Sequence, residues 1–170
     1  MRIGRDRARY GALRTLKRSE CPIGIGANAA VATARPSSCR VVAVIYRGMR
    51  EASDGQPEIG RSGSTLGVRP GPGDNTDIPV DHSGDVVPKT GGMSVAPETP
   101  ESLPPHRRPP ESPYPAWELR LEDLPADLMY RPDPENPSKH GFVEPSIRMP
   151  FQDYEDALAS TRTAWTKAIP

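Results

Sequence analysis

Residues 85–96 read D-V-V-P-K-T-G-G-M-S-V-A, and the rest of the chain is organised around them. The apolar pair Val86 and Val87 leads into a turn at Gly91 and Gly92. Glycine adopts backbone conformations that other residues avoid, so the chain can reverse sharply here. The turn places the hydroxyl of Ser94 on a predicted strand. We expect this segment to form the middle of a cleft whose other walls come from earlier and later residues.

The ordered part of the chain opens with V-V-A-V-I-Y-R-G at residues 41–48. A run of β-branched and apolar residues is typical of a central strand that is buried on both faces. The strand ends at Arg47, which needs water, a carboxylate or an anionic ligand, because an unpaired buried cation is costly. Arg47 is then either a strand-end residue that faces solvent or a clamp for phosphate or carboxylate, whose geometry its guanidinium fork matches.

The composition indicates one domain with a basic extension. The chain has 170 residues, of which 35% are hydrophobic, with 22 prolines and 15 glycines. Its formal net charge is zero, but residues 1–40 hold nine Lys and Arg against two acids, which leaves 13 against 20 for residues 41–170. We expect residues 1–40 to be a disordered extension and residues 41–170 to be the folded domain. Three origins stay open for the extension: a tail for nucleic acid or membrane surfaces, a targeting segment, or an addition from an early start site.

The cysteines and the apolar runs indicate where in the cell the protein is located. Cys21 and Cys39 lack CxxC spacing and clustered histidines, which argues against a zinc site and favours reduced thiols. No run approaches the roughly 18 apolar residues that a membrane span needs. Residues 21–34 lack the apolar core of a secretory signal. We therefore expect neither a membrane span nor a secretory signal peptide, and a protein that is cytoplasmic or delivered into a target cell.

Two long segments are predicted to be loops. Residues 51–81 are polar, and I-P-V at residues 78–80 is the only apolar anchor predicted for them. Residues 97–115 contain eight prolines, which fix φ and remove backbone donors, so this segment should be extended at the surface. It includes the run H-R-R at residues 106–108. It is a strap that covers the fold, a mobile loop that lines a substrate site, or a ligand for SH3-type domains.

The last third of the chain alternates short strands and turns before a helix. Residues 117–121 alternate with period two, which predicts a strand with one buried face. Residues 130–137 predict a polar turn, and residues 140–145 predict a short strand. Residues 150–167 predict an amphipathic C-terminal helix. Its core face holds Phe151, Tyr154, Leu158 and Trp165. Short strands, long loops and one helix indicate an α+β fold.

The common catalytic signatures do not occur in this sequence: no P-loop, no dinucleotide fingerprint, no H-E-x-x-H and no G-x-S-x-G. The three histidines are too scattered to predict a metal site. A triad of Ser94, His140 and an acid can be drawn, but no pattern places the three together. What remains is Arg47 at a strand end, the Gly-Gly-x-Ser turn, and a late strand with His140 and Glu144, in that order.

That ordered set carries a resemblance. The pair Tyr46-Arg47, the turn T-G-G-M-S at residues 90–94, and His140 ahead of a C-terminal helix resemble ADP-ribosyltransferase-like toxins. They are similar to the family of type VI secretion effector toxins that has relatives in actinobacteria and fungi. The resemblance covers about residues 45–167 and implies a small split β-sandwich with a C-terminal amphipathic helix and long Pro/Gly-rich loops. It also implies NAD as a substrate held between two small sheets, and an immunity protein as a partner.

The resemblance implies a role for each site residue. An oxocarbenium-like state forms when nicotinamide leaves ribose, so a carboxylate such as Glu144 would stabilise positive charge or orient the nucleophile. Arg47 would clamp the pyrophosphate or ribose, and Ser94 would hydrogen-bond the ribose or support the carboxylate. The expected catalytic residues are Arg47, Ser94 and Glu144. The expected NAD-binding residues are Tyr46, Arg47, Gly91, Gly92, Ser94 and His140.

The chain departs from the family pattern at two places. Gly92-Met93-Ser94 stands where many members have Ser-Thr-Ser, and Phe142 stands where arginine-modifying members have Glu or Gln. The prediction is therefore a toxin-like NAD-dependent transferase with an unidentified target. The alternative is a catalytically inactive protein-interaction domain on the same scaffold. Nucleic acid is not favoured as a partner, and no metal is expected.

Overall fold

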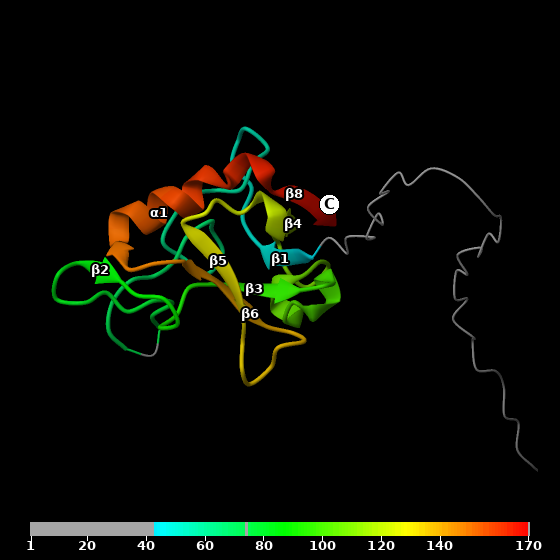
Figure 1. Cartoon of the computed structure of the whole chain (residues 1–170). Helices are drawn as coiled ribbons and strands as arrows, with labels where there is room; N and C mark the ends of the chain where they lie inside the picture. Colours follow the sequence, from blue (N-terminus) through cyan, green and yellow to red (C-terminus); the bar gives the residue numbers. More distant parts are fainter. Residues whose placement is uncertain (1–42, 74, 170) are drawn as a thin grey trace, which may run out of the picture. The chain divides into compact units, whose positions relative to one another are not determined.

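The computed structural model describes residues 43–73 and 75–169. The described chain is α+β: mostly antiparallel strands with one α-helix near the C-terminus (Figure 1). The expectations for residues 1–40 and for both cysteines lie outside the described residues. Within the described residues, no helix is long and apolar enough to cross a membrane.

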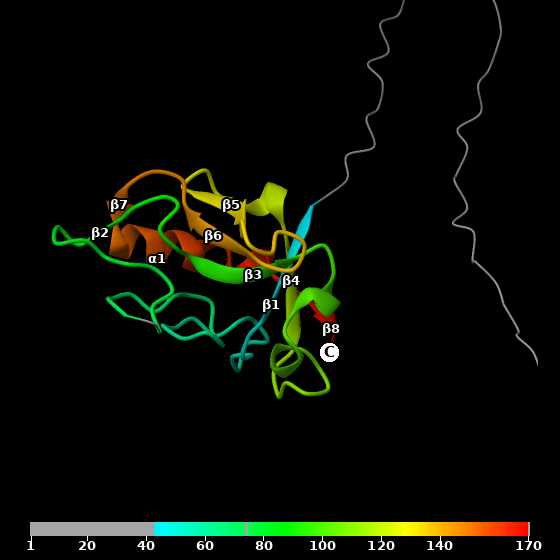
Figure 2. The same cartoon turned by 90° about the horizontal axis from the view of Figure 1, so that it is seen from below.

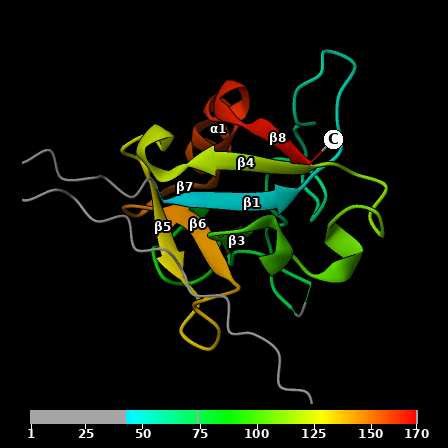
Figure 3. The same cartoon turned by 90° about the vertical axis from the view of Figure 1, so that its right-hand side faces the viewer.

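Six strands pair in the order β5-β6-β3-β1-β4-β8, and β2 and β7 form a separate pair. All the paired strands are antiparallel. Figure 3 shows β1 between β3 and β4, with β8 beyond β4. The strands are β1 Val44–Gly48, β2 Asp85–Val86, β3 Met93–Pro97, β4 Ala116–Arg120, β5 Leu128–Pro132, β6 Gly141–Pro145, β7 Met149–Pro150 and β8 Thr166–Ile169.

The central position predicted for the first strand is confirmed. β1 pairs with β4 over five residues and with β3 on its other side. Ile45 and Tyr46 alternate between the two faces, and each is buried in a different apolar cluster. Side chains on both faces of such a strand are buried, which explains why its sequence is apolar up to Arg47.

The strand β3 changes partners half-way along its length. Its end pairs with β1 only at Tyr46↔Ala96 and Ile45↔Pro97. Its start pairs with β6, where Ser94 lies opposite Phe142. The sheet therefore opens between β1 and the first half of β3, next to Arg47.

The C-terminal helix is shorter than predicted. α1 spans Phe151–Ser160, followed by a 3-10 turn (η4, Arg162–Ala164) and β8. The Thr161 hydroxyl donates to the Leu158 carbonyl and accepts a bond of 3.0 Å from the indole N–H of Trp165. Trp165 does lie in the core with Tyr154, but it is held by this turn rather than by the helix. Trp165 has helical spacing from Leu158 only by chance, because a turn lies between them, and this spacing led to the wrong helix end.

Figures 1 and 2 show α1 lying along one face of the sheet, and its buried residues Tyr154 and Leu158 pack there. The predicted strand at residues 117–121 is confirmed one residue earlier, as β4, with Trp117 and Leu119 buried. The turn predicted at residues 130–137 is wrong in its first half, because β5 runs to Pro132. β5 is an edge strand beside β6, which tolerates the polar and proline residues that masked it.

The two predicted loops are folded against the sheet. The strap (residues 97–115) carries two 3-10 turns, η1 (Pro100–Ser102) and η2 (Pro105–Arg107), instead of one extended run. Its Leu103 is buried against Tyr46. The described residues in the range 51–81 form isolated bridges and no strand, but Leu66 and Val68 are buried in addition to Ile78. The loop therefore has more apolar anchors than predicted. A third short turn, η3 (Leu121–Asp123), follows β4.

Candidate functional site

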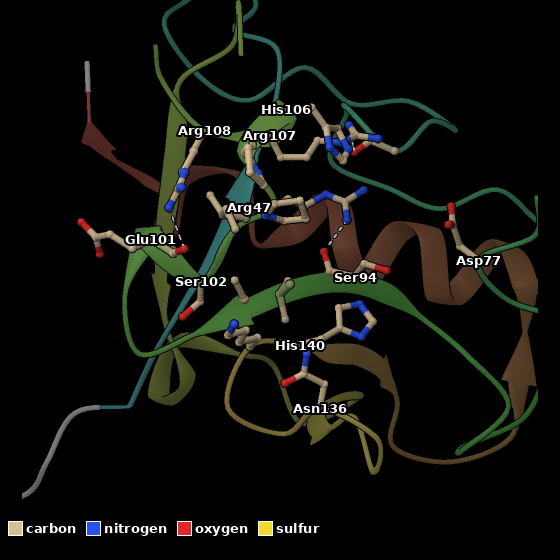
Figure 4. Close-up of a pocket in the computed structure, with 18 of the residues that line it drawn as sticks. Arg47, Asp77, Ser94, Glu101, Ser102, His106, Arg107, Arg108, Asn136 and His140 are labelled. Carbon is tan, nitrogen blue, oxygen red and sulfur yellow. Dashed lines mark hydrogen bonds between the residues drawn. The ribbon is translucent and has the colours of Figure 1, made fainter. Parts of the chain in front are cut away.

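A pocket of about 610 Å³ lies beside the opening in the sheet (Figure 4). Its floor includes Arg47 at the end of β1 and Ser94 on β3. The strap forms one wall through residues 101–108, and the end of the β5–β6 hairpin forms another through His140. A cavity of this size is within the ~300–1,000 Å³ range of ligand pockets.

The pocket is strongly cationic. Five of its lining residues are Arg or Lys and two are acidic, a net formal charge of +3 with the histidines neutral. Residues 41–170 as a whole hold 13 basic against 20 acidic residues. Positive charge is therefore concentrated in this pocket of an otherwise acidic domain. The cations are Arg47, Arg69, Arg107, Arg108 and Lys139; the acids are Asp77 and Glu101; the histidines are His106 and His140.

Arg47 is buried, with 5% of its surface exposed, and carbonyl oxygens hold its guanidinium. Its Nη1 donates to the Ser94 carbonyl at 2.5 Å. Ser94 lies where β3 no longer pairs with β1, so Arg47 replaces a strand partner for this oxygen. Its Nε and Nη2 donate to the carbonyl of Thr65, and Nη2 also to that of Gly67. Burial lowers the pKa of Arg47 to about 10, so it stays charged at neutral pH. Arg47 thus links a loop to the opening in the sheet and puts a positive charge on the pocket floor.

The other arginines of the pocket are also fixed by the protein. Arg69 forms a fork with Asp77, with Nη2 to Oδ1 at 2.9 Å. Arg107 donates from Nη1 to the Gly63 carbonyl at 2.8 Å. Arg108 donates from Nη1 to the carbonyl of Glu101 at 2.8 Å, as Figure 4 shows. Side chains held in this way lose little further freedom when they meet an anion, which favours binding.

The strap is packed closely against the pocket floor. A Cβ on Gly48 would collide with the backbone oxygen of Arg107, and one on Gly63 would lie 2.8 Å from its Nη2. Both glycines therefore allow the strap to approach. Of the alternatives left open for residues 97–115, this packing favours a strap that covers the fold, and the same strap lines the pocket.

Ser94 and His140 line the pocket together with Arg47. Ser94 is half-buried, and Figure 4 shows His140 close to β3 on the hairpin side of the pocket. The structure therefore brings three of the predicted site residues to one place.

Glu144 lies outside this pocket. It is fully buried, and its Oε2 accepts from Arg131 Nε at 2.8 Å and from the Lys89 backbone N–H at 3.2 Å. Its Oε1 has no partner among the described residues. Glu144 is four residues beyond His140 on β6, about 13 Å at ~3.3 Å per residue. Its predicted catalytic role stays a prediction.

Three further predicted residues also do not line the pocket. Tyr46 packs in the apolar cluster under the strap. A Cβ on Gly91 would collide with the Asp77 carbonyl, and one on Gly92 would lie 2.5 Å from the Val143 carbonyl. Close packing of the protein's own backbone explains both glycines.

No group of three or more His, Cys, Asp or Glu side chains that suits a metal ion occurs among residues 43–73 and 75–169. Compared with protein-family models and with curated proteins, the chain matches none of them.

Sequence reasoning did not identify Arg69, Lys139 or Asn136 as site residues, yet all three line the pocket. They come from two loops that are distant in sequence, and no spacing rule connects them. No sequence signal singles them out, because Arg and Lys are no denser in these loops than in residues 41–170 as a whole.

Proposed function

We propose that the chain is a toxin-like, NAD-dependent ADP-ribosyltransferase that binds NAD in the cationic pocket beside β3. The observation that carries the proposal is the net formal charge of +3 on a pocket of about 610 Å³ in an acidic domain. NAD carries a pyrophosphate, and a concave positive site raises the local concentration of such an anion. The pocket also has enough volume for a ligand of nucleotide size.

The opening in the sheet supports the same proposal. The start of β3 pairs with β6 and its last two residues pair with β1, so β1 and β6 diverge on either side of Ser94. A split sandwich of the ADP-ribosyltransferase type would hold NAD at such a divergence. We propose this fold type together with the function.

The lining residues suit the chemistry of NAD. We assign Arg107 and Lys139 to the pyrophosphate and Ser94 to the ribose hydroxyls, and His140 lines the same pocket. Arg47 acts through its charge, because carbonyl oxygens already accept bonds from Nε, Nη1 and Nη2. A positive pocket also disfavours a cationic acceptor, which agrees with Phe142 at the position where arginine-modifying members have Glu or Gln.

The test is calorimetric titration of the purified protein with NAD, combined with measurement of nicotinamide release. Lys139→Gln removes one exposed pocket charge, and Lys89→Gln makes the same change outside the pocket. We expect Lys139→Gln to weaken NAD binding about fivefold at low salt, equivalent to ~1 kcal/mol. Lys89→Gln should leave the affinity unchanged.

Added salt should weaken binding to the unmodified protein, because the attraction is partly between exposed charges. If the unmodified protein neither binds NAD nor releases nicotinamide from it, the proposal is wrong. The alternative, a catalytically inactive interaction domain on this scaffold, would then remain.

A further inference from the structure

The loop between β5 and β6 is built around one carboxylate. Asp133 Oδ1 accepts from the Glu135 backbone N–H at 3.0 Å, and Oδ2 lies 2.7 Å from Nδ1 of His140. The Asp133 backbone N–H donates to the His140 carbonyl at 3.0 Å. Asp133 therefore closes the loop and holds the imidazole at its end.

The His140 ring is held on a second side as well. It packs edge-to-face against Phe142, with ring centroids 4.6 Å apart and an interplanar angle of 78°. The side chain is 35% exposed and lines the pocket (Figure 4). When Nδ1–H donates to a carboxylate, the lone pair of the neutral ring is on Nε2. The contact with Asp133 thus leaves Nε2 available as a proton acceptor.

Hydrogen bonds keep Asp133 ionised. The hydrogen bond from His140, followed by that from the Glu135 backbone, holds the pKa of Asp133 below its usual range. Lys139 is the neighbour of His140 in the chain, and Arg131 lies over the Phe142 ring. Across the pocket stand Arg47, Arg69, Asp77, Glu101, His106, Arg107 and Arg108.

Transfer from NAD to an oxygen nucleophile releases a proton, and Glu144 is buried away from the pocket. We propose that Asp133 and His140 form a proton-accepting pair, in which Nε2 of His140 deprotonates the acceptor water or hydroxyl. This inference rests on the proposed function. The C1′–N bond of NAD breaks, its electron pair goes to the nicotinamide nitrogen, and neutral nicotinamide leaves. A C1′–O bond forms, and the O–H proton passes to Nε2. His140 is then a catalytic residue and Asp133 a positioning residue.

The experiment measures nicotinamide release from NAD against pH for the unmodified chain, Asp133→Asn, His140→Gln and the double variant. Asparagine keeps an oxygen for the Glu135 N–H but cannot accept the Nδ1–H of His140. His82→Gln, in a turn outside the pocket, is the matched control. Thermal unfolding of every variant and NAD titration separate loss of fold or binding from loss of rate.

We expect each single variant to lose about 10²-fold in kcat, as removal of a general base does. NAD affinity should change less than threefold. The double variant should be no slower than the slower single variant, because the two residues act as a unit. The pH profile of kcat should differ from that of the unmodified chain in both single variants, which a merely structural contact would not cause.

Outcomes for the pair and for the proposed function are distinct. If the unmodified chain turns over NAD and the folded variants keep its rate and pH profile, the pair is refuted and the proposed function stands. Additive losses of the two variants would also refute a pair. If the unmodified chain neither binds nor consumes NAD, both proposals fall.

Discussion

Replacing Arg47 with methionine should destabilise the domain rather than only weaken nucleotide binding. Methionine keeps an unbranched apolar stem but has no donors. The guanidinium donates five hydrogen bonds, and the acceptors lie in a loop and on β3. The acceptors are the backbone carbonyls of Ser62, Thr65, Gly67 and Ser94.

The distances set the expected magnitude. The bond to Ser94 is 2.5 Å and charge-assisted, worth about 1.5–3 kcal/mol. The other four bonds are 3.2–3.3 Å long, so we assign them about 0.5 kcal/mol each. Burial of the cation, which lowers the pKa of Arg47 to about 10, offsets part of this gain. The expected net loss in the free energy of unfolding is about 2–4 kcal/mol.

Urea denaturation measures this loss. With a slope of about 2 kcal/mol/M, the midpoint should fall by about 1–2 M. Arg47→Lys keeps the charge but not the fork, so its loss should be intermediate. A loss below about 0.5 kcal/mol for Arg47→Met, together with abolished NAD binding, would refute the scaffold role and show that Arg47 is a ligand clamp.

Three further predictions follow from the packing around β3 and β6. Gly92→Ala should cost about 1–3 kcal/mol and lower the thermal midpoint, because the new Cβ would lie 2.5 Å from the Val143 carbonyl oxygen; an unchanged midpoint would contradict the packing. Tyr154 is buried, which raises its pKa, so stability should be lost above pH ~10, where the unfolded chain ionises and the folded chain does not. Tyr154→Phe should reduce that alkaline loss, as urea midpoints at pH 8 to 11 would show. Glu144→Gln should lower the free energy of unfolding by about 1–3 kcal/mol, because Arg131 loses a buried charged acceptor. NAD affinity should stay within about threefold. Lost affinity with normal stability would instead support a direct role for Glu144.

Local sequence patterns determined several elements of this protein. The near-continuous apolar run at residues 41–48 predicted a central strand, and β1 is buried on both faces. The period-two pattern at residues 117–121 predicted β4. These predictions succeed because side-chain direction along a strand depends only on local geometry. They failed at β5, an edge strand, and beyond Ser160, where a turn rather than a helix presents Trp165 to the core.

The sequence by itself also indicated that residues 85–96 and Arg47 are important, but not why. Gly91 and Gly92 are glycines because the protein's own carbonyls lie against them. Arg47 is held by the Ser94 carbonyl at the opening in the sheet and by carbonyls of the loop at residues 62–67. Only the tertiary structure decided that Ser94 and His140 share a pocket with the strap, and that Glu144 does not line it. Pocket walls are made by loops far apart in sequence, and their meeting depends on how a whole sheet diverges, which no local spacing encodes.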